Sequence, residues 1–309
     1  MRECKRCKHS LHNGVKDGCR EKAYSKRSVL GYRVSPCLFV GYRVGAKNVL
    51  VKERNPRVNP MRTIAIANQK GGVGKTTSTA NIGAGLTRLG KKVLLIDLDP
   101  QAHLTYSMGI LAHELTRTIY QVLKGEATVE DVTLDRDELK LIPSTLDLSG
   151  AEMELSGLPG REFLLREAID KPRGFDFILV DCPPSLGLLT LNAFTTVKEI
   201  FIPLQMEFLA LQGMGKLLQT VEVVKKRLNK ELSVTGVIGT RFDSRKTLNR
   251  EVEEKIKAHF GDKVFKTRIR ENISLAEAPS HGQSIFEYRP DSHGAEDYLA
   301  LCKEIIKRE

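Results

Sequence analysis

The stretch Asn68-Gln69-Lys70-Gly71-Gly72-Val73-Gly74-Lys75-Thr76-Thr77 decides the class of fold, because of the segments that flank it. Residues 63–67, Thr-Ile-Ala-Ile-Ala, are mostly apolar, as in a buried strand, and the residues after the stretch have the apolar spacing of a helix. A strand, a glycine-rich loop and a helix in this order form a site for phosphate groups. Glycines let backbone N–H groups curl around phosphate oxygens, and the start of the helix adds its positive dipole end. A glycine turn without a ligand is the alternative. It does not explain why Gly-Lys-Thr-Thr stands at the point where the loop passes into the helix.

The polar side chains of this loop suit a nucleoside triphosphate and its metal ion. Lys75 is placed to neutralise the β and γ phosphates, and the Thr76 hydroxyl is placed to ligate Mg²⁺. We therefore predict that the cofactors are ATP and Mg²⁺. The predicted nucleotide-binding residues are Gly71, Gly72, Val73, Gly74, Lys75, Thr76 and Thr77.

Two other apolar segments end in carboxylates. Residues 177–181, Phe-Ile-Leu-Val-Asp, predict a buried strand that brings Asp181 close to Mg²⁺. Residues 93–99, Val-Leu-Leu-Ile-Asp-Leu-Asp, carry Asp97 and Asp99 on one side of a strand, because side chains two residues apart share a face. A simple Asp-Pro turn is the alternative for Asp99. The predicted metal ligands are Thr76, Asp97 and Asp181.

Strands and helices alternate along the chain from residue 61 to its end. This pattern is typical of a doubly wound α/β fold, in which a mostly parallel sheet is covered by helices on both faces. We predict one such domain over residues 61–309. The clearest strands span residues 63–68, 93–97, 175–181, 199–203 and 234–239, and the helices span residues 76–89, 161–170, 213–229, 247–260 and 295–307.

The first sixty residues differ in composition from the rest of the chain. They hold 15 of the 49 Lys and Arg but only four of the 38 Asp and Glu, so they carry the whole formal net charge of +11. They show no sustained periodicity, and Met61 stands before the first strand as an initiator would. We expect residues 1–60 to be a disordered or non-native basic leader. The alternative is a zinc site formed by four of its cysteines, which are Cys4, Cys7, Cys19 and Cys37.

Beyond the leader the chain is formally neutral, so its bulk charge gives no indication of a nucleic-acid partner. Cys182 and Cys302 stand far apart in sequence, and no secretory leader precedes them. Nowhere do 18 consecutive apolar residues occur. We therefore expect a soluble cytoplasmic protein with no membrane partner.

The phosphate loop departs from the ordinary G-x4-G-K-[ST] pattern, because the residue five positions before Gly74 is Gln69. It resembles the deviant Walker A loop of the ParA/MinD group, which begins with a second lysine, here Lys70. Over essentially all of residues 61–309 the chain resembles the ParA/Soj family of chromosome and plasmid partitioning ATPases. The further matching segments are Asp97-Leu98-Asp99-Pro100-Gln101, Asp181-Cys182-Pro183-Pro184-Ser185, Pro203-Leu204-Gln205-Met206-Glu207 and Glu277-Ala278-Pro279-Ser280-His281-Gly282.

The resemblance implies a switch that ATP operates. In that family ATP closes two protomers face to face, and the lysine that reaches the partner's nucleotide corresponds to Lys70. The family's water-positioning aspartate corresponds to Asp99, so the predicted catalytic residues are Lys70, Lys75 and Asp99. The ATP-bound homodimer binds double-stranded DNA without sequence preference, and a ParB-like centromere-binding partner stimulates slow hydrolysis, which releases the ATPase. We therefore expect a segregation ATPase associated with the nucleoid.

One departure from the family concerns DNA. The second arginine of the family's Pro-Arg-Asn-x-Arg segment is replaced by Ser274, whereas the other family DNA arginine is present as Arg245. A solvated helix face is the alternative for such basic side chains. The predicted DNA-binding residues are Arg245, Lys246, Arg250, Arg268 and Arg270.

Three other functions compete with a segregation ATPase. A MinD-like membrane switch normally carries a terminal amphipathic helix, and the sequence ends at Glu309 with nothing beyond the domain. A redox protein akin to the nitrogenase iron protein needs two cluster cysteines per subunit, and Cys182 alone stands near the ligand edge. A ParA relative that positions another cytoplasmic cargo stays open.

Overall fold

The computed structural model describes residues 61–136, 138–169, 174–207 and 214–308. The chain divides after Asn55 into two units, and all the described elements belong to the second. The predictions for residues 1–60, which are the basic leader and the alternative zinc site at its cysteines, lie outside the described residues.

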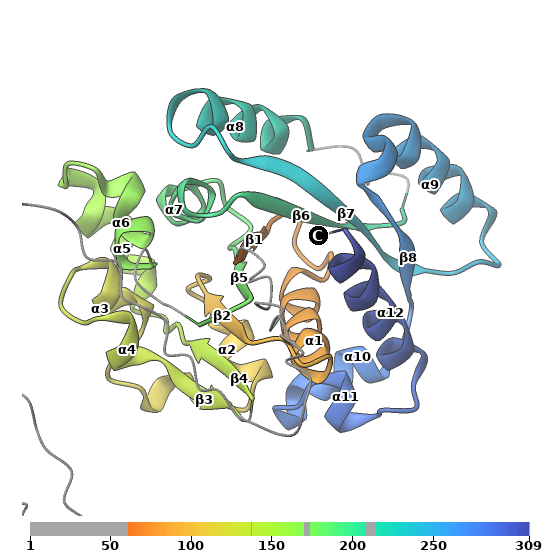
Figure 1. Cartoon of the computed structure of the whole chain (residues 1–309), viewed down its shortest axis with the longest axis horizontal. Coiled ribbons are helices and arrows are strands. Elements are labelled where there is room, and N and C mark those ends of the chain that lie inside the picture. The colour runs from red at the N-terminus through yellow and green to blue at the C-terminus, as the bar shows by residue number, and fades with distance from the viewer. Residues whose placement is uncertain (1–60, 137, 170–173, 208–213, 309) are drawn as a thin grey trace, which may run out of the picture. The chain divides into compact units, whose positions relative to one another are not determined.

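One sheet runs through the described part of the chain and contains eight strands there (Figure 1). The strand order is β3-β4-β2-β5-β1-β6-β7-β8, and every pair is parallel except β3 with β4. Parallel strands bring their carboxyl ends to one edge, so the loops that follow β1, β2 and β5 lie together. The strands are β1 Arg62–Ile66, β2 Val93–Asp97, β3 Leu134–Arg136, β4 Leu139–Ile142, β5 Phe177–Asp181, β6 Glu199–Gln205, β7 Ser233–Phe242 and β8 Val264–Arg270.

Helices cover both faces of the sheet (Figure 1). The α-helices are α1 Lys75–Arg88, α2 His103–Ser107, α3 Ile119–Leu123, α4 Val129–Val132, α5 Leu148–Glu154, α6 Leu164–Ile169, α7 Leu188–Thr196, α8 Met214–Arg227, α9 Thr247–Phe260, α10 Ser274–Glu277, α11 Ile285–Tyr288 and α12 His293–Lys307. Short 3-10 turns occur at η1 Ala112–Glu114, η2 Leu155–Gly157, η3 Arg161–Phe163, η4 Gly261–Lys263 and η5 Ala278–His281.

Two hydrophobic cores lie on the two faces, and β1 contributes to both. Ile64 and Ile66 belong to the core that α1 and α12 cover, whereas Ala65 belongs to the core that α7 and α8 cover. Successive side chains of a strand point to opposite faces, so a central strand has to be apolar at every position. All five residues of β2 and all five of β5 are accordingly buried, including Asp97 and Asp181.

The predicted doubly wound α/β fold is confirmed, and the five predicted strands and five predicted helices are present with boundaries shifted by a few residues. The elements that the sequence did not predict are β3, β4, β8 and several helices of four to nine residues, such as α7. Short elements carry too few periods for a pattern to emerge. The edge strand β8 also contains three cations, Lys266, Arg268 and Arg270, which hide its alternation.

Candidate active site

The glycine-rich loop stands at the carboxyl end of β1, in the middle of the sheet, and is fastened to two neighbouring strands. The side-chain amide of Asn68 donates to the Pro203 carbonyl of β6 at 2.8 Å, and the Thr240 hydroxyl of β7 donates to the Val73 carbonyl at 2.9 Å. Gly72 and Gly74 have φ angles of 72° and 88°, which L side chains rarely adopt. The loop is therefore held in one shape before any ligand arrives.

The inside of this loop is open and faces a lysine. A side chain built at Gly71 or Gly72 would meet no atom within 4 Å. Lys75 begins α1 and is only 8% exposed, and its ammonium donates to the Lys70 carbonyl at 3.4 Å. A long bond to one carbonyl is a weak partner for a buried cation, so the ammonium is available to an anion seated in the loop.

Asp181, at the end of β5, holds the first turn of α1. Its Oδ2 accepts a hydrogen bond from the Thr76 hydroxyl at 2.7 Å, and its Oδ1 accepts one from the Thr79 hydroxyl at 3.0 Å. The carboxyl group is fully buried, and burial together with the nearby Asp97 raises its pKa to about 8. A divalent cation at Thr76 and Asp181 would favour the ionised form. Thr79 was not predicted from the sequence, although three residues after Thr76 on a helix is a neighbouring position.

Asp97 lies beside Asp181, because the two residues pair in register between β2 and β5. Its Oδ2 accepts hydrogen bonds from the backbone N–H of Thr105 at 2.8 Å and from the Thr105 hydroxyl at 2.7 Å. Burial raises the pKa of Asp97 to about 7, against the opposing effect of these bonds. The Asp97 carboxylate is thus bonded to α2, whereas the Asp181 carboxylate is bonded directly to Thr76, the third predicted metal ligand.

Asp99 takes a different environment two residues later. Its Oδ1 accepts from the backbone N–H of Gln101 at 3.0 Å, and the following turn reaches Ala102 in the left-handed region with φ of 53°. The turn expected as the alternative role of Asp99 is therefore formed. Among the described residues nothing binds its Oδ2, which leaves one carboxylate oxygen for water or ligand.

The second lysine of the loop turns away from the first. The Lys70 ammonium lies 3.2 Å from the Glu207 carboxylate, which follows β6, and both side chains are about half exposed. The Lys70 charge is therefore exposed on the surface at the carboxyl edge of the sheet, which we call the nucleotide edge. Glu207 is a site residue to which the sequence alone assigned no role.

A cavity of about 450 Å³ opens beside the loop. Gly72, Val73 and Gly74 form one wall, and residues at the ends of β7 and β8 and just after β8 form the other, among them Arg241 of β7 and Asn272. Its place next to the start of α1 suits the nucleoside half of a nucleotide whose phosphates occupy the loop. This second wall was not predicted from the sequence, because its residues come from segments about 170 to 200 positions after the loop.

The structure gathers three of the five predicted DNA residues. Arg245 is 88% exposed and donates three hydrogen bonds to Asp243, two from its guanidinium and one from its backbone N–H, which lower the pKa of that carboxyl to about 2. Lys246 lies 3.5 Å from Glu271, and Arg250 donates to the Ser244 carbonyl. These three cations mark the junction of β7 and α9, which we call the β7–α9 patch.

Arg268 and Arg270 lie on β8, beside Phe242 at the end of β7. Arg268 binds Glu253 of α9 at 2.6 Å, and Arg270 binds Asp297 and Glu296 at the start of α12, both at 2.6 Å. Ser274, which stands in place of the family's arginine, is buried. The two β8 arginines are thus paired with acids of α9 and α12, and their role in DNA binding stays a prediction.

Other kinds of site receive little support from the described residues. There, no group of three or more His, Cys, Asp or Glu is arranged to hold a metal ion, whereas Mg²⁺ with a nucleotide needs only one or two carboxylates. Cys182 and Cys302 are both buried, and burial raises the pKa of each thiol well above its usual range. In the same part of the chain, no helix has the length and apolar character needed to cross a membrane.

Known proteins resemble this chain from residue 61 onward. The AAA domain family AAA_31 matches residues 61–234. The sporulation initiation inhibitor protein Soj of Bacillus subtilis is 47% identical over 247 residues, 79% of this chain and 98% of that protein. The chromosome partitioning protein ParA of Caulobacter vibrioides is 44% identical over 256 residues, 81% of this chain and 96% of that protein. A crystal structure of cobyrinic acid a,c-diamide synthase from Mycobacterium smegmatis, with a bound ATP analogue and magnesium, has a TM-score of 0.73 at 37% identity and covers 80% of this chain and 95% of that one.

Proposed function

We propose that this chain, which belongs to the ParA/Soj family of chromosome-partitioning ATPases, is a switch in which Mg²⁺-ATP closes a homodimer and hydrolysis opens it again. The family makes the chain an ATPase. The observation that carries the proposal is the arrangement of an open glycine loop, a weakly bonded buried lysine and a threonine fastened to a buried aspartate.

The nucleotide site of the proposal uses residues that the structure brings together. Lys75 and the loop N–H groups would neutralise the β and γ phosphates, and Thr76 with Asp181 would hold Mg²⁺. Bound magnesium would supply charge stabilisation to the transferred phosphate. Asp99, with one free carboxylate oxygen, would orient the attacking water.

The test of the nucleotide site is Lys75→Ala compared with Lys216→Ala, which removes an exposed lysine of α8. Loss of a charge that faces the phosphates should abolish ATP binding and turnover, whereas the α8 variant should keep both. Calorimetry and phosphate release measure the two quantities. Unchanged ATP affinity in Lys75→Ala would remove the loop from the proposal.

We extend the proposal to DNA through the β7–α9 patch. Arg241, which precedes the patch in β7, also lines the cavity beside the loop. A nucleotide in that cavity would therefore lie close to the segment that carries the patch. A dimer formed at the nucleotide edge would double the patch and strengthen its attraction for phosphates. No element with the form of a base-reading motif is present among the described residues, so binding should be independent of sequence. A ParB-like partner would then stimulate hydrolysis and release.

The DNA prediction is tested with a chain that begins at Met61, because the basic leader would bind DNA in any state. Retention on nonspecific duplex DNA should require ATP. In Arg245→Ala the log–log slope of affinity against salt should become less steep by about 0.9 for each DNA phosphate that the variant no longer neutralises. Arg166→Ala, an exposed cation of α6, is the matched control. Equal retention with ATP, with ADP and in Arg245→Ala would contradict an ATP-gated DNA site.

That outcome would favour a second function, an ATPase that positions another cytoplasmic cargo. One observation supports this alternative: Ser274 is buried and Arg270 is held by Asp297 and Glu296, so the family's second DNA cation has no exposed replacement at its own position. Under this alternative the ATP-dependent dimer forms as before, and only DNA retention is lost.

A further inference from the structure

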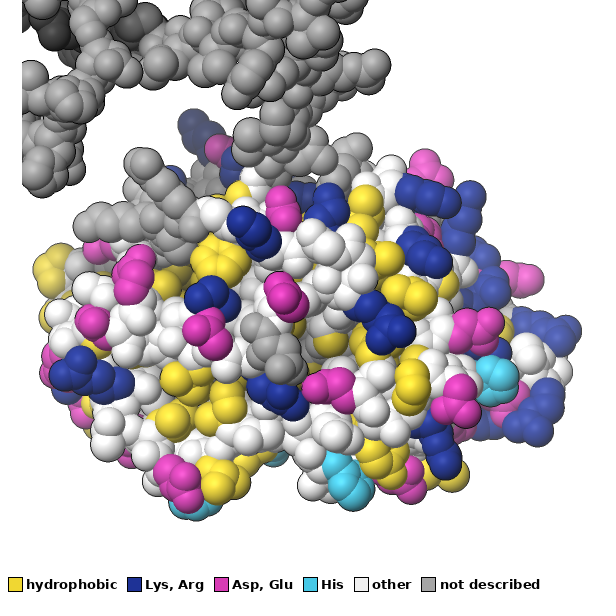
Figure 2. Space-filling model, turned by 60° about the horizontal axis from the view of Figure 1, so that its bottom comes forward, with side chains coloured by type: hydrophobic (Ala, Val, Ile, Leu, Met, Phe, Trp, Pro, Cys, Tyr) yellow, Lys and Arg dark blue, Asp and Glu magenta, His cyan; other side chains and the backbone are white. Residues whose placement is uncertain are grey.

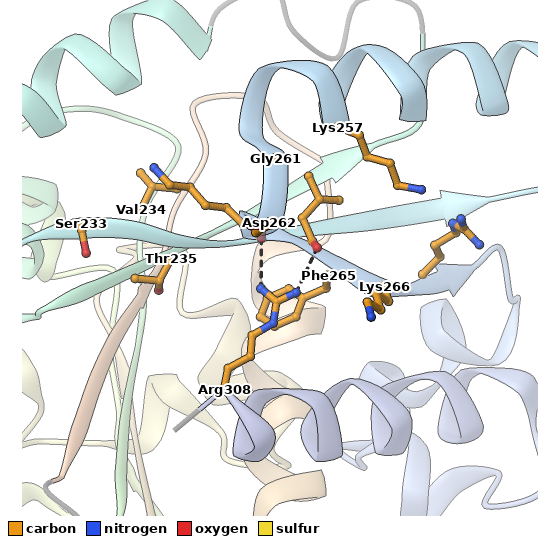
Figure 3. A pocket seen from close by; sticks show the side chains of 12 residues that line it. Ser233, Val234, Thr235, Lys257, Gly261, Asp262, Phe265, Lys266 and Arg308 are labelled. Carbon is orange, nitrogen blue, oxygen red and sulfur yellow. Dashed lines mark hydrogen bonds between the residues drawn. The ribbon is translucent and has the colours of Figure 1, made fainter.

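A second cavity lies at the edge of the sheet opposite the nucleotide, where β7 and β8 begin (Figure 3). Its volume is about 1010 Å³. Ser233, Val234 and Thr235 of β7 line one side, and the Arg308 guanidinium, which donates to the carbonyls of Lys263 and Val264, lines the other. None of these residues takes part in the proposed nucleotide site.

The cavity exists because β8 is shorter than β7 at this end. β7 pairs with β6 from Ser233 onward, but its pairing with β8 begins only at Val237, opposite Val264. The chain enters β8 from the turn η4, which lies close to β7 but does not pair with it as a strand. Within the described ranges, no strand lies along residues 233–236 on the β8 side. An unpaired stretch of strand edge is a template for one more extended segment.

Several cations line this cavity. Lys and Arg side chains gather on the side of the molecule where α9 and β8 lie (Figure 2). Five cations line the cavity against one acid, Asp262, and these are Lys257, Lys263, Lys266, Arg268 and Arg308. Lys257, Arg268 and Arg308 are paired with Glu253 or Glu304.

The ammonium groups of Lys263 and Lys266, by contrast, make no hydrogen bond or ion pair with any described residue. Both side chains are exposed. Two unpaired cations at the entrance of a cavity attract an anionic ligand and need give up no internal partner to bind it.

The floor of the cavity is apolar and offers no ring to a nucleic-acid base. Val234 is 7% exposed and Phe265 is 2% exposed, and the Arg308 guanidinium covers the Phe265 ring at 4.1 Å. Single-stranded nucleic acid is bound by stacking on exposed aromatic rings, which this floor lacks. For an added strand whose alternate side chains are apolar, the apolar neighbour is Val234, because Phe265 belongs to the core on the other face and is covered by Arg308.

We propose that this cavity, which we call the β7 edge cavity, docks an extended acidic segment of a partner protein. The segment lies along residues 233–236 as an added strand, its apolar side chains lie on the face of the sheet to which Val234 belongs, and its carboxylates pair with Lys263 and Lys266. The first sixty residues of this chain carry +11 and have the wrong sign of charge for this place. Docking of the segment requires neither nucleotide, dimer nor DNA.

The probe is a capped ten-residue peptide of alternating Glu and Val, applied to the full chain. Calorimetry should show binding that weakens at least about tenfold in K263E/K266E, because two carboxylate pairings become repulsions. R117E/K140E, with the same charge change at the other end of the sheet, should bind within about twofold of the wild type, and ATP turnover should stay unchanged in both variants. Hydrogen exchange should show new protection of the amides of residues 233–236.

Three further ligands test whether the cavity prefers an acidic strand to a basic peptide or a nucleic acid. The same peptide methylated at alternate backbone nitrogens should lose binding, because it cannot pair as a strand. A Lys-Val peptide should not bind, and a twelve-residue oligothymidylate should not displace the acidic peptide. No binding of the acidic peptide at about 1 mM, equal binding by K263E/K266E, protection elsewhere than residues 233–236, or displacement by the oligonucleotide would each overturn the proposal.

Discussion

At the scale of single residues, Asp97 and Asp181 are both fully buried carboxyl groups, and threonine residues donate hydrogen bonds to both. A fully buried carboxylate is costly unless hydrogen bonds compensate the loss of water. Thr105 supplies two such bonds to Asp97, and Thr76 and Thr79 supply one each to the two oxygens of Asp181. Asp99 differs, since the described residues use only one of its oxygens. Asp99, whose second carboxylate oxygen has no partner among the described residues, is therefore the residue to which we assign the orientation of the attacking water.

Asp99→Ala should therefore bind ATP with affinity close to that of the wild type but hydrolyse it at least about 100-fold more slowly, because it loses the group that orients water. Single-turnover phosphate release measures the effect. Asp99→Asn is the informative control, since its amide oxygen can still accept from the Gln101 N–H and keep the turn. Full activity in both variants would mean that Asp99 serves only the turn.

Lys70 is paired with Glu207 rather than with its own loop. An exposed pair of this kind contributes little to stability, so it can open when a stronger anion approaches. Lys70→Ala should keep the affinity for ATP within a few-fold, yet remain monomeric with ATP in sedimentation velocity. Lys216→Ala on α8 should dimerise as the wild type does. An intact ATP-dependent dimer of Lys70→Ala would contradict the assignment of that lysine to the partner's nucleotide.

At the scale of elements, α1 packs very closely on its neighbours. A Cβ atom at Gly83 would lie 2.7 Å from the Leu95 side chain of β2, and one at Gly85 would lie 2.6 Å from Cys302 Sγ of α12. Both distances are shorter than real carbon contacts allow. Glycine at these two positions lets the helix that carries Lys75 and Thr76 sit directly against the sheet and α12.

The substitution Gly85→Ala has two opposing effects on stability, one on helix propensity and one on packing. The helix gains up to about 1 kcal/mol from replacing glycine with alanine, whereas overpacking costs about 1 to 3 kcal/mol. Because Cys302 is fully buried and Phe286 lies 3.2 Å from the new Cβ, we expect a net loss of about 1 to 2 kcal/mol in the free energy of unfolding. Gly215→Ala in α8, where no atom lies within 4 Å, is the matched control and should not destabilise. Denaturant unfolding of the two variants decides the sign.

At the scale of the whole molecule, the proposed nucleotide site and the β7 edge cavity lie at opposite edges of the sheet. Its carboxyl edge holds the glycine loop, the aspartates and the cavity beside them, whereas the β7 edge cavity lies at the amino ends of β7 and β8. A partner bound at the amino edge would leave the nucleotide accessible. The two sites can therefore be mutated and assayed independently.

Deletion of residues 1–60 should leave ATP turnover and the midpoint of thermal unfolding unchanged within error, because the described cores are built from residues from Met61 onward. Calorimetry of the full and shortened chains measures this. Stoichiometric zinc in the full chain that disappears in Cys4→Ser/Cys7→Ser would contradict the prediction of a dispensable leader.

The sequence by itself determined the class of fold and the phosphate loop. Both depend on contiguous residues: the apolar runs that become β1, β2 and β5, and the glycines whose backbone freedom the loop needs between Lys70 and Lys75. Such patterns are local, because a strand or loop imposes its period on neighbouring residues.

Only the tertiary structure decided which remote side chains meet. Thr76 and Asp181 are 105 positions apart, and Lys70 and Glu207 are 137 positions apart. Their contacts arise because parallel strands that are distant in sequence end at one edge of one sheet, which no local pattern encodes. The same reason applies to the β7 edge cavity, which results from the different lengths of β7 and β8 at their amino ends. It applies equally to Arg268 and Arg270, whose partners Glu253 and Asp297 lie on separate helices.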